Sequence, residues 1–90
     1  MQRIYKYELA ITDIQQISMP VRARVLSVAN QGGKLCLWAM VTPNTPYNLR
    51  SFRIIGTGNP IEDNPFDKNP TGAFIGTVLM PPFVWHVFEL

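Results

Sequence analysis

The segment Asn30 to Gly33, with two adjacent glycines, constrains the fold of this chain most strongly. Such a pair adopts the positive φ angles that a tight chain reversal needs. Residues 22–29 and 34–42 flank it, so the sequence predicts a β-hairpin at this position. In 34–42 both alternating faces are apolar, with Leu35 and Leu37 on one face and Cys36 and Trp38 on the other. A strand of this kind is covered on both faces, which predicts a central place in a sheet.

Alternation with a period of two indicates further strands. Residues 3–11 place Tyr5, Tyr7 and Leu9 on one side, and a short alternation at Ile17 and Met19 ends at Pro20. Because proline cannot donate to a central ladder, we expect a short edge strand there, with a single helical turn as the alternative. The remaining expected strands are residues 50–55, 74–80 and 83–90, the last two joined across Pro81 and Pro82.

Two segments rich in proline and asparagine are expected to be loops. Residues 43–48 hold two prolines and two asparagines, and residues 56–72 hold three of each. A loop as long as the second one in a compact domain is usually functional or mobile.

The chain is predicted to be one all-β domain over residues 1–90, since so short a core does not divide into two stable halves. With 47% hydrophobic and 16% charged residues it should fold. We find no amphipathic helix and no internal repeat, and expect five to seven strands in a meander-like antiparallel sandwich or open barrel. Few residues are left to cover the second apolar face of strands such as 83–90, which predicts a homo-oligomer.

Targeting signals are not apparent in the sequence. It has no apolar run long enough for a membrane span, and residues 1–6 do not resemble a signal peptide. We therefore expect a protein of the cytoplasm without membrane association.

Catalytic chemistry is not expected. His86 is the only histidine and Cys36 the only cysteine, and both lie inside apolar strands. A nucleophile and base pair made of these two residues is conceivable, but an inert buried thiol is the favoured interpretation of Cys36. No cofactor motif is present, and we predict neither catalytic residues nor an enzyme.

A metal site is not expected either. Glu62, Asp63 and Asp67 form the one close set of carboxylates and could hold a hard cation such as Ca²⁺, but the twelve-residue calcium loop pattern is absent. We take them as solvated loop acids.

Charge is unevenly distributed along the chain. Seven of the eight Lys and Arg residues lie in residues 1–53, and four of the six acidic residues lie in 54–90. The net charge of +2 is too weak to argue for nucleic acid, which we do not expect as a partner. The asymmetry can still create a local face that attracts small anions, or the charges mix in three dimensions.

The segment Arg50 to Asn59 is the most suggestive candidate site. Arginine offers bidentate donors to phosphate, and a glycine turn lets backbone N–H groups approach an anion. An aromatic plane for a base can come from Trp85, Trp38 or Tyr47, and a β-bulge or tight corner is the structural alternative for the glycines. Because Arg50 and Arg53 are three apart on a strand, they should point to opposite faces. The predicted ligand-binding residues are Arg50, Arg53, Gly56, Thr57, Gly58, Asn59, Trp85 and His86.

In five short segments the sequence resembles a family of small uncharacterised proteins encoded by bacteriophages and prophages. They are Ile4 to Leu9, Cys36 to Ala39, Phe52 to Ile54 with Gly56 to Ile61, Ile75 to Val78 and Val84 to Glu89. The resemblance implies a viral origin and the cytoplasm of an infected bacterium as location. It leads to the hypothesis of a phage accessory protein that works by binding, such as a counter-defence protein that sequesters a nucleotide-derived immune signal. The alternative is a protein-interaction or virion-associated module.

Overall fold

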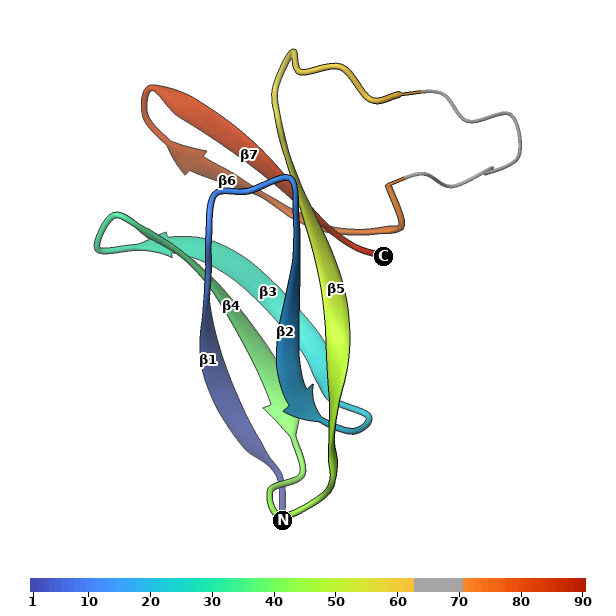
Figure 1. The fold of residues 1–90 in the computed structure, drawn as a ribbon. Helices are drawn as coiled ribbons and strands as arrows, with labels where there is room; N and C mark the ends of the chain where they lie inside the picture. Colours follow the sequence, from blue (N-terminus) through green and yellow to red (C-terminus); the bar gives the residue numbers. More distant parts are fainter. Residues whose placement is uncertain (63–70) are drawn as a thin grey trace.

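A computed structural model describes residues 1–62 and 71–90 of the chain, and these residues form strands without a helix (Figure 1). In particular, they include no helix that is long and apolar enough to cross a membrane. The seven strands are β1 (Arg3–Leu9), β2 (Ile14–Pro20), β3 (Arg24–Gln31), β4 (Lys34–Val41), β5 (Tyr47–Gly56), β6 (Ala73–Met80) and β7 (Phe83–Glu89).

The strands form two antiparallel sheets, ordered β1-β4-β3 and β2-β5-β7-β6. The predicted all-β fold is confirmed, and of the two expected architectures it is the sandwich. The meander-like order is wrong, because the chain changes sheet after β1, β2 and β4, and only β3–β4 and β6–β7 are hairpins. The physical reason is that an apolar sheet face must be covered by a second layer. By passing between the sheets, the chain builds both layers, and each layer covers the apolar face of the other.

The predicted hairpin is confirmed at β3 and β4. Gly32 and Gly33 have φ angles of 60° and 83°, as a two-residue turn of type I′ requires. The side-chain oxygen of Asn30 accepts a hydrogen bond from the Gly33 N–H at 2.9 Å. The expected loop was two residues too long, because Asn30 and Gln31 still pair with β4. β4 lies in the middle of its sheet, as predicted.

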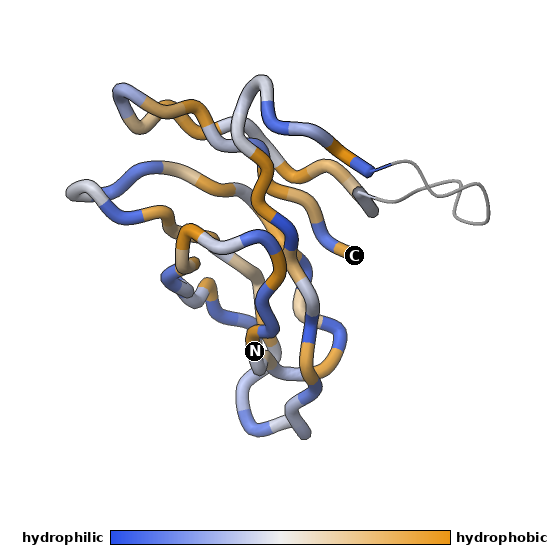
Figure 2. The backbone as a smooth tube through the Cα atoms, turned by 45° about the horizontal axis from the view of Figure 1, so that its top comes forward, coloured by the Kyte–Doolittle hydropathy of each residue, from blue (hydrophilic) through white to orange (hydrophobic). Residues whose placement is uncertain are grey.

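The core lies between the sheets and draws on both. Leu35 and Leu37 of β4 face Met19 of β2, Phe52 of β5 and Val87 of β7, and all five are at most 1% exposed. Hydrophobic and hydrophilic residues alternate at short intervals along the strands (Figure 2), as is typical of strands that bury one face.

Polar side chains surround Cys36 on the outer face of the three-stranded sheet. Lys6 of β1 reaches across β4 and donates to the side-chain oxygen of Gln31 at 2.9 Å, and Lys34 lies 3.6 Å from Glu8. Cys36 lies beneath them and is 3% exposed, although its neighbours Leu35 and Leu37 fill the core on the other side. The expected buried thiol is confirmed.

The other boundaries differ modestly from expectation. β1 ends at Leu9, and β5 begins at Tyr47 inside the expected loop. β2 is an edge strand that ends at Pro20, as predicted. Of the long loop, residues 63–70 lie outside the described residues.

Candidate functional site

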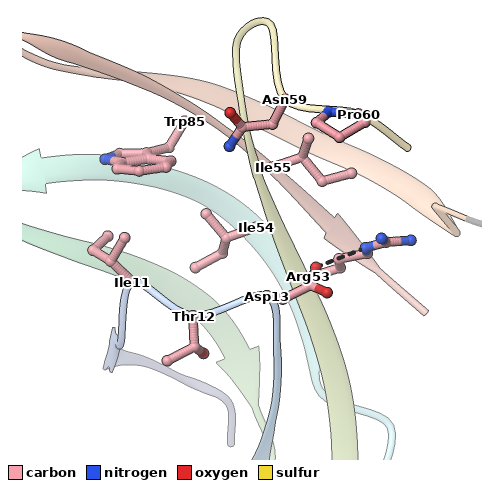
Figure 3. A pocket seen from close by; sticks show the side chains of 9 residues that line it. All are labelled: Ile11, Thr12, Asp13, Arg53, Ile54, Ile55, Asn59, Pro60 and Trp85. Carbon is pink, nitrogen blue, oxygen red and sulfur yellow. Dashed lines mark hydrogen bonds and ion pairs between the residues drawn. The ribbon is translucent and has the colours of Figure 1, made fainter. Parts of the chain in front are cut away.

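The β1–β2 link and the residues after β5 both lie in the upper part of the molecule in Figure 1. Between the β1–β2 link, the end of β5 with the residues after it, and one residue of β7 lies a cavity of about 350 Å³, which we call the Trp85 cleft (Figure 3). It is lined by Ile11, Thr12, Asp13, Arg53, Ile54, Ile55, Asn59, Pro60 and Trp85.

Trp85 forms the aromatic wall of the cleft. Its side chain is partly buried and packs on the core, and its ring stacks on Phe83 with a centroid distance of 5.4 Å and an interplanar angle of 27°. Two neighbouring hollows, one at the β3–β4 and β6–β7 turns and one at Gly56 to Asn59, also include Trp85 in their walls. The Trp85 indole therefore forms part of the wall of all three hollows.

Gly56 is required because Asn59 and Trp85 both pack against its backbone. A Cβ atom there would lie 2.8 Å from the side-chain nitrogen of Asn59 and 3.0 Å from a ring carbon of Trp85. The chain turns immediately afterwards, since the Asn59 N–H donates to the Gly56 carbonyl at 3.0 Å and Gly58 has a φ angle of 85°. This turn sets the Asn59 amide beside the aromatic wall. The glycines are thus explained by local packing and turn geometry.

Arg53 supplies the positive charge at the rim of the cleft. Its Nε donates to a carboxylate oxygen of Asp13 at 3.0 Å (Figure 3), and the side chains are 16% and 69% exposed respectively. From the sequence alone, Arg53 could lie beside the glycine turn or pair with a carboxylate such as Glu62 or Asp63. Among the described residues, Asp13 is a carboxylate that pairs with Arg53, and Asp63 lies outside the described residues. A bound anion would share Arg53 with Asp13. Its affinity for the cleft would therefore depend on contacts with the other lining residues as well.

Arg50 lies in a different cavity. Its guanidinium makes a bidentate contact with the Glu89 carboxylate, with Nη2 to Oε1 at 2.9 Å, and its Nη1 donates to the Ala23 carbonyl at 2.6 Å. The hydrogen bond to Glu89 raises the pKa of Arg50. Arg50 therefore ties the β2–β3 link and β7 to β5, while Arg53 points to the other face of β5, as predicted.

His86 and Thr57, both predicted site residues, meet on the outer face of the four-stranded sheet. The His86 Nε2 lies 2.7 Å from the Thr57 hydroxyl, and Nδ1 lies 3.0 Å from the Thr77 hydroxyl. A neutral imidazole donates through one nitrogen and accepts through the other, so both hydroxyls are used in holding the ring. Trp85 precedes His86 and faces the opposite side of β7.

The other sequence candidates do not come together. Cys36 and His86 lie in different sheets, on outward-facing positions, so the conceivable nucleophile and base pair is not assembled. Of the three loop acids, Asp63 and Asp67 lie outside the described residues, and within residues 1–62 and 71–90 no three potential ligand residues group around a metal position. Trp38 lies on the outer face of the three-stranded sheet, and Tyr47, 58% exposed, begins β5.

Sequence reasoning missed the contribution of the β1–β2 link to the cleft. Ile11 was expected inside a strand and Asp13 was not considered, yet both line the cavity with Thr12. Their position follows from the pairing of Ile14 with Arg53, which joins segments some forty residues apart in sequence. No local signal in the sequence reports that register.

Comparison with known proteins gives a family and no activity. Residues 1–90 match the family model described as a domain of unknown function, DUF7352, so the chain belongs to that family. No curated protein and no solved structure matches the chain.

Proposed function

We propose that this member of the DUF7352 family is a phage accessory protein that works by binding rather than by catalysis, and that it captures a small nucleotide-like anion in the Trp85 cleft. A nucleotide-derived immune signal in the cytoplasm of an infected bacterium is the ligand class that fits this role. The supporting observation is that Arg53, Asn59 and Trp85, three of the residues that the sequence suggested, line one cavity of about 350 Å³.

Each wall suits a different part of such a ligand. The Trp85 ring offers a stacking plane, and stacking of a base on an aromatic side chain contributes about 1–3 kcal/mol. Asn59 offers an amide that can both donate and accept at a base edge. Arg53 offers charged donors to a phosphate, each hydrogen bond contributing about 1.5–3 kcal/mol. Volumes of about 300 Å³ and more are the ordinary range of small-molecule sites.

The test is a thermal-shift and titration panel of cyclic nucleotides and ADP-ribose-type nucleotides. The wild type should be stabilised by at least one member, and Arg53→Ala and Asn59→Ala should weaken its binding about tenfold or more. Lys34→Ala is the matched control, because it removes the same charge from an exposed ion pair with Glu8, and neither residue lines the cleft. If no nucleotide shifts the melting temperature of the wild type, or if Lys34→Ala and Arg53→Ala behave alike, the proposal fails.

A homo-oligomer is part of the proposal. Several large apolar side chains remain exposed on this chain, and a second copy is the economical cover for them. Light scattering should return a mass above the 10.2 kDa of one chain. A mass equal to one chain at all concentrations would reject this part.

A protein-interaction or virion-associated module is the second candidate, and one patch favours it. Phe74 and Leu79 of β6 are 59% and 66% exposed on the outer face of the four-stranded sheet, and Phe74 packs edge-on against Phe88 with ring centroids 5.5 Å apart. Exposed apolar patches mark protein interaction sites. Copurification from infected cells with a stoichiometric protein partner, lost in the double variant Phe74→Ser and Leu79→Ser, would support this function in place of the first.

A further inference from the structure

β2 presents an open edge of the four-stranded sheet. Its neighbour is β5, and hydrogen bonds just beyond its two ends show how its backbone is oriented: the Ile54 N–H donates to the Asp13 carbonyl at 2.9 Å, and the Val21 N–H donates to the Pro46 carbonyl at 2.8 Å. In an antiparallel ladder every second residue bonds to a given neighbour. The odd-numbered residues therefore face β5.

The even-numbered residues of β2 direct their N–H and C=O groups to the free edge. These are Ile14, Gln16 and Ser18, and all three are exposed. Pro20 is also even-numbered, so its backbone nitrogen faces away from β5. The N–H that proline lacks is therefore not needed for the pairing of β2 with β5. The free edge thus carries an unbroken row of donors and acceptors from Ile14 to Ser18.

The sequence of β2 lacks the charges that usually protect an edge strand. No residue from Ile14 to Pro20 is charged, whereas the edge strand β1 carries Arg3, Lys6 and Glu8. The two remaining edges, β3 and β6, contact each other across the layers. Among the described strands, β2 alone combines an open edge with an uncharged sequence.

We infer that a second copy of this chain pairs with β2, antiparallel and across a twofold axis at Gln16. A twofold-related copy presents the same strand in the antiparallel direction, and its surface is complementary to itself. With Gln16 opposite Gln16 of the second copy, Ile14 lies opposite Ser18, every backbone donor on the free edge between them is used, and Pro20 need not donate. The two four-stranded sheets become one continuous sheet.

A second copy fits this edge better than a charged peptide because no fixed charge on β2 selects a complementary one. Identical strands meet here without repulsion, and the carboxamides of the two Gln16 side chains can hydrogen-bond to each other. The inference rests on the proposed homo-oligomer and names its interface. It does not depend on the ligand of the Trp85 cleft.

Gln16 also provides the test. Gln16→Lys and Gln16→Glu each place like charges opposite each other at the axis, so each should run as a monomer at concentrations where the wild type has about twice the mass of the 10.2 kDa chain. An equimolar mixture of the two should restore the doubled mass. Ile4→Lys is the control, because it adds a charge at a 59% exposed position of the other edge strand, β1, and should leave the dimer intact.

A further variant removes the hydrogen bond instead of adding charge. Gln16→Pro deletes one N–H from the free edge and leaves the bonds of β2 to β5, so it should weaken the dimer with the circular dichroism spectrum unchanged. A monomeric wild type overturns the inference. So does a dimer that survives in all Gln16 variants, a mixture that stays monomeric, or loss of the dimer in Ile4→Lys. Nucleotide-induced thermal shifts, measured on the same samples, report the cleft separately.

Discussion

Replacing Arg50 by alanine should destabilise the fold far more than removing any exposed lysine. Arg50 contributes two contacts to Glu89 and one to the Ala23 carbonyl, and it joins three segments that are distant in sequence. Its side chain is 20% exposed and that of Glu89 22%. The variant leaves a largely buried carboxylate and a carbonyl without their donor.

The magnitude lies between two limits. Exposed ion pairs contribute at most about 1 kcal/mol. Removing one partner of a fully buried pair costs about 3–5 kcal/mol. Since roughly four fifths of each side chain is shielded, we expect Arg50→Ala to lower the free energy of unfolding by about 2–3 kcal/mol. For a domain of this size that corresponds to a decrease of about 10–20 °C in melting temperature.

Urea denaturation followed by tryptophan fluorescence measures this loss, at one fixed protein concentration because oligomerisation shifts apparent stability. Lys34→Ala is the control, since the pair of Lys34 with Glu8 is 65% and 59% exposed and should contribute less than about 0.5 kcal/mol. Arg50→Lys keeps the charge without the bidentate geometry and should fall between the two. Equal losses for Arg50→Ala and Lys34→Ala would refute the structural role of Arg50.

Three further predictions follow from individual contacts. The Tyr7 hydroxyl is buried without a hydrogen-bond partner among the described residues, so Tyr7→Phe should raise the free energy of unfolding by up to about 1 kcal/mol in urea titrations. If the variant instead loses more than about 1 kcal/mol of stability, the hydroxyl is hydrogen-bonded. Burial raises the pKa of Tyr7 above 10.0, so the folded state favours the neutral form of the side chain. The free energy of unfolding should therefore fall as pH rises above about 10, and it should fall less steeply in Tyr7→Phe; the same pH dependence in both proteins would contradict this. Gly33→Val should cost about 1–2 kcal/mol because φ is 83° there, a loss that Gly33→Asn should largely avoid.

The sheet strands were predictable because their signals are local. Adjacent glycines at 32 and 33 dictate a reversal, and alternation places the inward rows of β1 and β4 without reference to the rest of the chain. The apolar character of both faces of 34–42 likewise gave β4 its central position. Such features depend on residues only a few positions apart.

The assembly of the cleft was only partly predictable, for the opposite reason. The segment Arg50 to Asn59 and Trp85 were recognised by residue type, but alternation sends Arg50 and Arg53 to different cavities. Asp13, one partner of Arg53 within the described part of the chain, is brought to it by the β2–β5 register. The change of sheet after β1 follows from how two layers cover each other, and no short segment of sequence encodes it.

Small molecules released on denaturing the purified protein, after incubation with extract of phage-infected bacteria, test the central proposal most directly. Wild type and the Lys34→Ala control should release the same nucleotide-type compound in stoichiometric amount, and Arg53→Ala should release at most about a tenth as much. Equal release from all three proteins would place the ligand outside the Trp85 cleft. Release of no nucleotide-type compound from the wild type would contradict the binding function itself.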